Sequence, residues 1–252
     1  MKIGDPTELF GQLGQEEMKV FKERFGAVKT LLKPGDTFRF ECDKGGQCCK
    51  NRFGNPIALS TYDIARLRRR LKMTSGEFLS KHTFIVLGED SHLPLAFLQF
   101  EEKSEGRNKC PFLRSYGCSV YDDRPLRCRL YPLGRAVDLQ GVSYFFIMDA
   151  GDYCGVGKGK LYTVEEWIKN SGIEPYLKWS DRFIKLLFNL DLAKFKELET
   201  GQKVKAAVIM YDIDLLMEET QGPGQPDKKY DDDETLSMSH IALKSFLRSA
   251  LS

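Results

Sequence analysis

The sequence has few histidines, no long apolar run and almost no net charge. Its 252 residues include 3 histidines and carry a formal net charge of +2. A near-neutral chain gives no electrostatic reason to expect nucleic acid or an anionic membrane as a partner. No stretch approaches the ~20 apolar residues that a membrane-spanning helix needs, and residues 1–10 lack the basic and apolar regions of a secretory signal. We therefore expect a cytoplasmic protein without a nucleic-acid or membrane partner.

Short motifs of several enzyme classes are also absent. The sequence contains no P-loop, no G-x-S-x-G and no H-E-x-x-H pattern, so the phosphate-binding, serine-hydrolase and zinc-peptidase sites built on these patterns are not expected. The segment Gly155–Gly159 is rich in glycine, but it is not a G-x-G-x-x-G turn between a strand and a helix, and we do not interpret it as a nucleotide loop. Motifs alone leave open whether the protein is an enzyme.

What the sequence does contain is a cluster of cysteines. The chain has 7, and they are Cys42, Cys48, Cys49, Cys110, Cys118, Cys128 and Cys154. Because cytosolic thiols stay reduced, such a cluster indicates metal binding or catalysis rather than disulfides. The cysteines stand beside turn-forming residues, and none lies after residue 155. Cysteines that only fill a core would also occur on helix faces. We predict that all of these cysteines are metal ligands.

The spacing of the cysteines bears on the identity of the metal. Zinc fingers and ribbons usually supply ligands as close C-x2–4-C pairs, and this sequence has no C-x-x-C. Cys48 and Cys49 are adjacent, and adjacent side chains of an extended backbone point to opposite sides, which predicts that they do not share one metal ion. The thiols also outnumber the ligands of one tetrahedral zinc ion. An iron–sulfur cluster is therefore favoured, and zinc together with a second, three-cysteine site is the alternative.

Other side chains contribute less clearly to such a site. His82, His92 and His240 fall outside every cysteine segment and are not expected to be ligands. Arg124 and Arg129 stand close to Cys128 in the sequence, and positive charge stabilises anionic thiolates. We predict that these two arginines lie beside the metal centre and support its ligands. The alternative is a solvated basic loop paired to Asp122 and Asp123.

Periodicity and capping signals predict an α+β fold. The predicted helices are 13–32, one opened at Ser60, one at Thr74, one at Thr163, one after Pro175, and about 235–250. The predicted strands are 36–41, 83–87 and 95–100, with a hairpin at 136–149 about Gly141. Three segments lack a clear pattern: 110–135 is predicted as an irregular loop, 221–234 as a mobile loop, and 203–217 fits a helix or a strand.

These elements divide the chain into three parts. Residues 1–35 are predicted to form an N-terminal helix, residues 36–160 a cysteine-cluster metal-binding domain, and residues 161–252 a helical C-terminal region. The expected architecture is a small, irregular, cysteine-rich core centred on the metal. Short strands belong to this core, helices flank it, and the C-terminal half is helical.

Short motifs in this sequence resemble those of a known family. They are F-x-C-x-x-x-G-x-C-C at Phe40–Cys49, C-P-F-L at Cys110–Leu113, G-C-S-V-Y at Gly117–Tyr121, R-P-L-R-C-R-L-Y-P at Arg124–Pro132, and C-G-V-G-K-G at Cys154–Gly159. In order and spacing this set resembles the YkgJ-type cysteine-cluster family, whose members are described as zinc- or iron-chelating and often as containing an iron–sulfur cluster. Flagellin lysine N-methylases look like relatives. Gly45 stands where the family usually has its second cysteine.

The resemblance covers roughly residues 36–160 and carries implications for function. It implies a protein that holds an iron–sulfur cluster, or zinc, through its clustered cysteines, and redox or protein-modifying work is compatible with it. An unidentified protein partner or substrate would accompany the latter. The alternatives are a structural zinc module that serves protein interaction, and a metal chaperone or chelator. The sequence shows no methyl-donor site.

Overall fold

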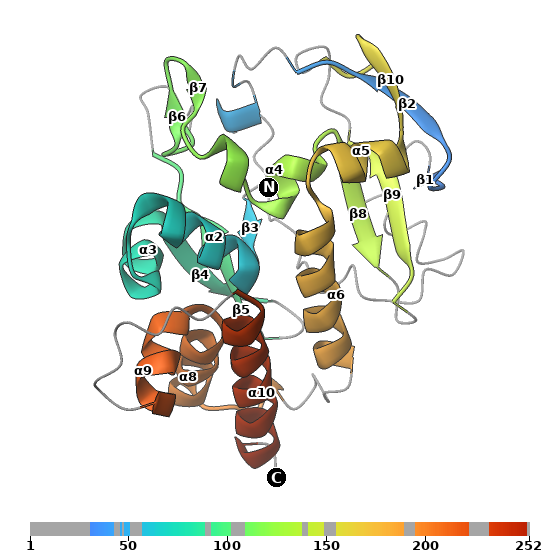
Figure 1. Cartoon of the computed structure of the whole chain (residues 1–252). Coiled ribbons are helices and arrows are strands. Elements are labelled where there is room, and N and C mark those ends of the chain that lie inside the picture. Colours follow the sequence, from blue (N-terminus) through green and yellow to red (C-terminus); the bar gives the residue numbers. More distant parts are fainter. Residues whose placement is uncertain are drawn as a thin grey trace. The chain divides into compact units, whose positions relative to one another are not determined.

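Helices and short antiparallel strands make up the protein (Figure 1), which confirms the predicted α+β class. The computed structural model describes residues 31–42, 46, 48–50, 57–88, 92–101, 109–137, 141–148, 155–188, 195–221 and 232–250. The chain forms two compact units, each built from separate segments. The cysteine unit comprises 1–56, 100–121 and 126–178, and the helical unit comprises 57–99, 122–125 and 179–252. The predicted domain boundaries after residues 35 and 160 stay predictions.

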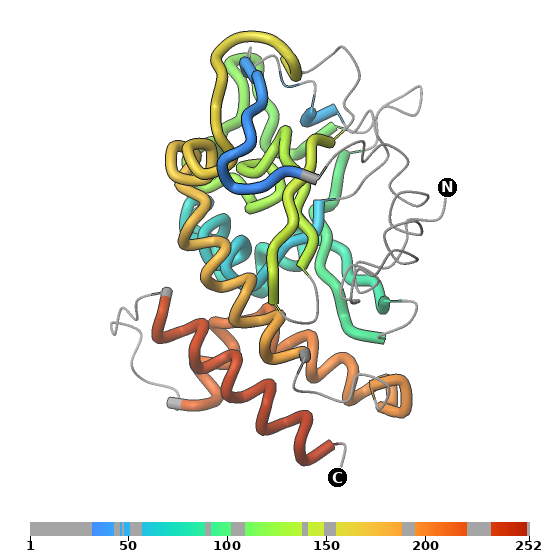
Figure 2. The backbone as a smooth tube through the Cα atoms, turned by 90° about the vertical axis from the view of Figure 1, so that its right-hand side faces the viewer, coloured from blue at the N-terminus to red at the C-terminus, as the bar shows by residue number. Residues whose placement is uncertain are grey.

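Small antiparallel sheets frame the cysteine unit. Strands β1 (Leu31–Leu32), β9 (Ser143–Ile147) and β8 (Leu133–Val137) form one sheet in that order, and β2 (Thr37–Phe40) pairs with β10 (Lys160–Thr163). In Figure 2 the tubes of β8 and β9 run side by side, as their register requires. The strand predicted at 36–41 and the hairpin predicted about Gly141 are therefore confirmed. Gly141 has a φ of +82°, which glycine adopts without the strain of a Cβ.

Two predictions for the cysteine unit need correction. Of the helix predicted over 13–32, residues 13–30 lie outside the described residues, and Leu31–Leu32 form β1 because they pair with Phe145 and Phe146 of β9. The loop predicted over 110–135 contains regular elements, namely β6 (Leu113–Arg114), β7 (Gly117–Cys118), α4 (Leu126–Leu130) and the start of β8. Elements of two to five residues are too short to show a period in the sequence.

An aromatic core supports the cysteine unit. Phe38 and Phe40 of β2 are buried, and Trp167 of α5 (Val164–Asn170) meets both rings edge-on at centroid distances of 5.9 and 5.3 Å. The Trp167 indole also donates a hydrogen bond to the carbonyl of Leu130, at 3.0 Å. Thr163 and Glu166 cap α5 reciprocally, as predicted. Each such aromatic pair adds roughly 0.5–1.5 kcal/mol beyond area burial, so β2 is held firmly against α5.

The helical unit combines one three-stranded sheet with several helices. The sheet has the order β3 (Ala58–Leu59), β5 (Pro94–Leu98), β4 (Thr83–Leu87). The helices are α2 (Thr61–Leu71), α3 (Ser75–His82), α8 (Thr200–Tyr211), α9 (Ile213–Gln221) and α10 (Asp232–Ala250). Helix α6 (Glu174–Phe188) begins in the cysteine unit and ends in the helical unit. The segment 203–217, whose sequence fitted a helix or a strand, is helical. Most of the loop predicted over 221–234 lies outside the described residues.

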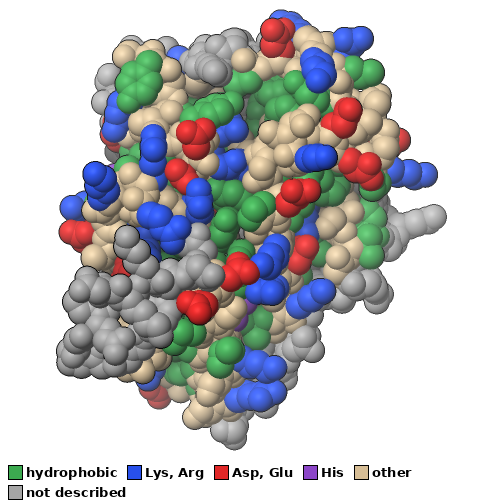
Figure 3. Space-filling view, in the orientation of Figure 1, with side chains coloured by type: hydrophobic (Ala, Val, Ile, Leu, Met, Phe, Trp, Pro, Cys, Tyr) green, Lys and Arg blue, Asp and Glu red, His purple; other side chains and the backbone are tan. Residues whose placement is uncertain are grey.

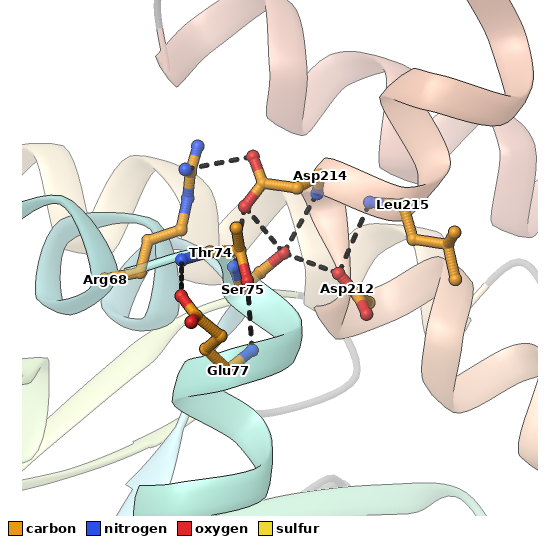
Figure 4. Close-up of polar contacts among 7 residues, drawn as sticks. All are labelled: Arg68, Thr74, Ser75, Glu77, Asp212, Asp214 and Leu215. Carbon is orange, nitrogen blue, oxygen red and sulfur yellow. Dashed lines mark hydrogen bonds and ion pairs between the residues drawn. The ribbon is translucent and has the colours of Figure 1, made fainter. Parts of the chain in front are cut away.

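Helices α3 and α9 cap each other through a buried serine (Figure 4). Ser75, fully buried at the start of α3, donates its backbone N–H to Asp214 Oδ2 at 2.6 Å and its hydroxyl to Asp212 Oδ1 at 2.6 Å. In return, the backbone N–H of Asp214 donates to Ser75 Oγ at 2.9 Å. Arg68 of α2 forms an ion pair with Asp214 Oδ1 at 3.0 Å. The two carboxylates thus satisfy helix N-termini and a guanidinium.

Replacing Ser75 by alanine is expected to destabilise the helical unit. Ser75→Ala removes the donor to Asp212 and the acceptor for the Asp214 N–H, which leaves buried polar groups unpaired. We expect the free energy of unfolding to fall by about 1–3 kcal/mol, measured by urea titration. Ser80→Ala, at an exposed position of the same helix, should change it by less than about 0.5 kcal/mol. Equal effects of both variants would show that the reciprocal cap contributes nothing.

His240 of α10 is packed among aromatic rings within the helical unit. Its imidazole meets the Trp179 ring at 5.5 Å and the Phe183 ring at 5.9 Å between centroids. Trp179 donates its indole N–H to Asp233 Oδ1 at 3.1 Å, and the Arg182 guanidinium lies over the Trp179 ring. Burial lowers the pKa of His240 to about 4, and the positive charge of Arg182 acts in the same direction.

The lowered pKa of His240 predicts acid-sensitive stability. Because the imidazole has a pKa near ~6.5 in the unfolded chain, the unfolded chain binds more protons than the folded one between pH 6.5 and about 4. Stability should therefore fall as the pH decreases through this window, by about 2–3 kcal/mol in total. Urea titrations at several pH values should show a shallower dependence in His240→Gln. Identical dependences in both proteins would contradict the buried neutral imidazole.

The charged surface is mixed in sign on the face shown in Figure 3. Lysine and arginine side chains alternate there with aspartate and glutamate, and hydrophobic side chains lie between them. Among the helices of the described residues, none has both the length and the apolar character to cross a membrane.

Candidate metal centre

Separate backbone segments of the cysteine unit bring cysteines together. Cys48 and Cys49 begin a short 3-10 turn, Cys48–Lys50. The backbone N–H of Cys110, a buried residue, donates to the carbonyl of Cys49 at 2.8 Å. The hairpin of β6 and β7 places Leu113 opposite Cys118, and the N–H of Leu113 donates to the carbonyl of Cys110 at 3.1 Å. A continuous chain of backbone contacts therefore leads from Cys49 through Cys110 to Cys118.

The thiols of these cysteines interact with one another. The Sγ atoms of Cys48 and Cys49 lie 3.8 Å apart, and the Cys49 thiol shares a hydrogen bond with the thiol of Cys110. The charge of Cys118 also acts on Cys49. We call Cys48, Cys49, Cys110 and Cys118 the thiol group. It contains two neighbours in sequence and two cysteines from distant segments.

The surroundings of Cys49 favour its protonated form. The hydrogen bond with the Cys110 thiol raises the pKa of Cys49 to about 12, with burial and the negative charges of Cys110 and Cys118 acting in the same direction. The hydrogen bond with Cys48 acts in the opposite direction. Gathering several thiolates without a cation is costly because like charges repel. A bound metal cation removes that repulsion, so metal binding would release protons from this group.

The arrangement of Cys48 and Cys49 corrects one argument from the sequence. Their opposed directions were predicted for an extended backbone, but the backbone here is a 3-10 turn, and both sulfurs lie on one side within 3.8 Å. Tetrahedral coordination with metal–sulfur bonds of about 2.3 Å separates two ligand sulfurs by about 3.8 Å. By distance, this pair is therefore suited to one metal atom.

Gly46 allows the turn before the thiol group to approach β6 closely. Its φ is +68°, and a Cβ at this position would lie 2.6 Å from Cδ1 of Leu113. The N–H of Cys49 donates to the carbonyl of Gly46 at 3.0 Å, which closes the turn. A residue with a side chain would meet both backbone strain and a packed leucine at this position.

A second convergence lies where β2 ends, next to Cys42. Phe40 forms a bridge with Val156, and the N–H of Glu41 donates to the carbonyl of Gly155 at 3.2 Å. A Cβ on Gly155 would lie 1.8 Å from the carbonyl oxygen of Glu41. Cys42 is exposed, and Cys154, which precedes Gly155 in the sequence, lies outside the described residues. The contact therefore joins the end of β2 to the segment that begins at Gly155.

The contacts of Arg129 involve the turn that follows α5. Arg129 is buried, donates from Nη1 to the carbonyl of Ser171 at 2.9 Å, and stacks over the Tyr176 ring at 4.6 Å. These contacts hold the turn between α5 and α6. Arg124 belongs by its segment to the helical unit. A role of either residue beside the thiolates stays a prediction.

The charge of Arg127 interacts with that of Cys128. Burial lowers the pKa of Arg127, and the negative charge of the neighbouring Cys128 opposes that shift. Cys128 itself is half-buried on α4. This pair could be found from the sequence, because the two residues are adjacent. The histidines all belong to segments of the helical unit.

The cysteine thiolates are donors that suit a thiophilic metal. Thiolates are preferred ligands of zinc and of iron in iron–sulfur clusters. Within the described ranges, no three or more His, Cys, Asp or Glu side chains lie close enough together to hold a metal ion. The thiol group therefore supplies suitable donors and one pair at ligand spacing, and the remaining ligands require adjustment on metal binding.

Comparison with known families agrees with these donors. Residues 41–155 match the family model CxxCxxCC, described as a "putative zinc- or iron-chelating domain". The segment is similar to this family, and we refer to it below as the CxxCxxCC domain. It corresponds to the YkgJ-type family indicated by the sequence motifs, and it connects the chain with metal binding in general. Searches of curated proteins and of solved structures gave no match.

The CxxCxxCC domain of this chain departs from the pattern in the family's name. The pattern begins at Cys42 and ends at Cys48 and Cys49, and Gly45 replaces the second cysteine. The thiol group consists of Cys48, Cys49, Cys110 and Cys118. It therefore does not depend on a cysteine at position 45.

The contact between Gly155 and Glu41 predicts different effects of two similar substitutions. Gly155 and Gly157 both have positive φ, at +72° and +80°, but a Cβ on Gly157 meets nothing within 4 Å. Gly157→Ala should lower the free energy of unfolding by about 1 kcal/mol through backbone strain. Gly155→Ala should cost about 3 kcal/mol or more, because the Glu41 carbonyl must move. Urea unfolding followed by tryptophan fluorescence measures both, and equal costs would contradict the close approach.

Proposed function

We propose that the CxxCxxCC domain binds an iron–sulfur cluster, with the thiol group as its first set of ligands. The observation that carries the proposal is the contact of Cys49 with Cys48, whose sulfurs lie 3.8 Å apart, and with the Cys110 thiol, together with the charge of Cys118 that acts on Cys49. Cys42, Cys128 and Cys154 are proposed as further ligands. A cytoplasmic location and a protein partner or substrate stay predictions.

The number of cysteines supports a cluster over a single zinc ion. The chain has 7 cysteines, which exceeds the need of one tetrahedral ion. In a [2Fe–2S] cluster held by cysteines, each iron carries two thiolates, and the spacing of the Cys48–Cys49 pair is compatible with this as well as with zinc. Arg127 beside Cys128 adds positive charge to a region of thiolates. A bound cluster would supply one-electron transfer, so redox work is the reaction class that follows from this proposal.

Two alternatives each have an observation in their favour. A structural zinc site needs four donors around one ion, and the thiol group has four. A metal chaperone needs ligands that a partner can reach, and Cys42 and Cys48 are exposed. Protein modification, which the likeness to lysine N-methylases suggests, has no further support among the contacts of the site.

Metal analysis of protein purified without oxygen distinguishes these alternatives. A [2Fe–2S] centre predicts about two irons and two acid-labile sulfides per chain, with visible absorption bands. Colourless protein with stoichiometric zinc and no sulfide would contradict the cluster and favour the structural site. Metal that passes quickly to a chelator in either case would favour the chaperone.

Substitution of single cysteines tests which thiols hold the metal. Cys49→Ser and Cys110→Ser should each abolish most of the bound metal, and Cys48→Ser should match Cys49→Ser because the two sulfurs lie on the same side of the turn. Ser115→Ala, at an exposed position between β6 and β7, is the control and should keep the metal content of the unsubstituted protein. Full metal content in Cys49→Ser and Cys110→Ser, with folding checked by circular dichroism, would exclude the thiol group as the centre.

A further inference from the structure

The backbones of Cys49 and Cys110 are close enough to be joined by a disulfide bond. The Cys110 N–H donates to the Cys49 carbonyl at 2.8 Å. A carbonyl oxygen lies about 2.4 Å from its own Cα and an amide nitrogen about 1.5 Å from its own, so these two Cα atoms are at most about 6.7 Å apart. Disulfides usually join residues whose Cα atoms are about 4.4–6.8 Å apart. The backbone therefore needs no rearrangement for this bond.

The side chains of the two residues also point toward each other. Their thiols share a hydrogen bond, which requires the Cβ–Sγ bonds to converge, as they must in a disulfide. Cys110 is buried and Cys49 is half-buried. A bond between them would consequently be shielded from bulky thiols in solution, but within reach of a small oxidant or reductant.

Cys48, the other neighbour of Cys49, is a poorer partner for such a bond. The two sulfurs lie 3.8 Å apart. However, consecutive Cα atoms across a trans peptide are about 3.8 Å apart, which is shorter than the lower limit of about 4.4 Å for ordinary disulfides. A bond between adjacent cysteines would strain the peptide inside the 3-10 turn Cys48–Lys50. Oxidation is therefore directed toward Cys110.

The described arrangement of these sulfurs suits a bond between two of them better than a bound cation. No three His, Cys, Asp or Glu side chains of the described residues are close enough to hold a metal ion, whereas Cys49 and Cys110 already meet. Metal binding requires further thiols to move in. A sulfur in a disulfide has no thiolate to offer a metal, so the two uses of this pair exclude each other.

We propose that Cys49 and Cys110 form a reversible disulfide that withdraws two ligands from the metal centre. The withdrawal of ligands rests on the proposed function, whereas the pairing of the two cysteines does not. Hydrogen peroxide is the oxidant. It converts one thiol to a sulfenic acid and releases water, and the second thiol then displaces the sulfenic hydroxyl as a second water. Two electrons and two protons thus pass from the thiols to one peroxide, and a dithiol reductant restores them.

Trypsin separates the cysteines of the thiol group and so allows the disulfide to be mapped. Metal-free, full-length protein is treated with one equivalent of hydrogen peroxide and digested without reductant. The main crosslink should join the peptide of Cys49 to that of Cys110, and it should exceed any other crosslink by about tenfold. Cleavage after lysine and arginine, except before proline, gives peptide 45–50 with Cys48 and Cys49, peptide 110–114 with Cys110, and peptide 115–127 with Cys118.

Single substitutions identify the cysteine that reacts within peptide 45–50. Cys48→Ser should keep the crosslink, and Cys49→Ser should abolish it. Because Cys48→Ser leaves Cys49 as the one cysteine of that peptide, its map decides the question even where Cys49→Ser does not fold. Ser115→Ala is the control and should keep the crosslink. A main product that links Cys48 to Cys49, a main crosslink to peptide 115–127, or a crosslink that survives Cys49→Ser would overturn the pairing.

Zinc titration before and after oxidation tests the withdrawal of ligands. Zinc is the probe because it binds thiolates without redox chemistry of its own. The oxidised chain should bind zinc at least about tenfold more weakly than the reduced chain, because two thiolates are lost. A dithiol reductant should restore the affinity. Equal zinc binding in both states, including none in either, would overturn the withdrawal of ligands. Iron and sulfide analysis of the reduced protein decides the proposed function separately.

Discussion

The hydrogen bond from the Cys110 N–H to the Cys49 carbonyl is the contact on which the candidate metal centre depends. It joins a turn near the start of the cysteine unit to the hairpin of β6 and β7, and the whole of the segment 57–99 lies between them in the chain. Closing so long a loop costs conformational entropy, and thiols that repel one another once ionised add to that cost. A metal cation would attract the ionised thiols and so replace their repulsion by a favourable interaction. This is why folding and metal binding are coupled in such domains.

The aromatic core holds part of the cysteine unit in place without a metal. Phe40, in contact with Trp167, lies two residues before Cys42, and its ring also meets Tyr131 at 5.6 Å, just after α4 and Cys128. Packing therefore fixes the backbone at two cysteine-bearing points before any ligand bond forms. Arg129, held by the Ser171 carbonyl and the Tyr176 ring, ties the same helix to the turn before α6. The core and the thiol group thus restrain neighbouring stretches of one unit by different forces.

Features encoded locally were predictable from the sequence, and features that depend on distant partners were not. The capping boxes at Ser60, Thr74 and Thr163 mark helix starts because both partners lie within four residues. Leu31–Leu32 form a strand only because β9 is beside them. Cys48 and Cys49 were assigned opposite directions because a 3-10 turn of three residues leaves no periodic trace. The cysteines themselves were recognisable as a set through their chemistry, but the partner of Arg129 is decided by a turn far along the chain.

The interleaving of the two units has a consequence for how the protein is made. The chain leaves the cysteine unit after residue 56, returns at 100, and leaves it for the last time after 178. On the ribosome, Cys48 and Cys49 emerge long before Cys110 and Cys118. The strands and helices of 57–99 must in turn wait for α8, whose Met210 carbonyl accepts from Thr61 and whose Tyr211 hydroxyl donates to Pro94. Neither unit is a continuous stretch of sequence, so no single cut in the gene separates them.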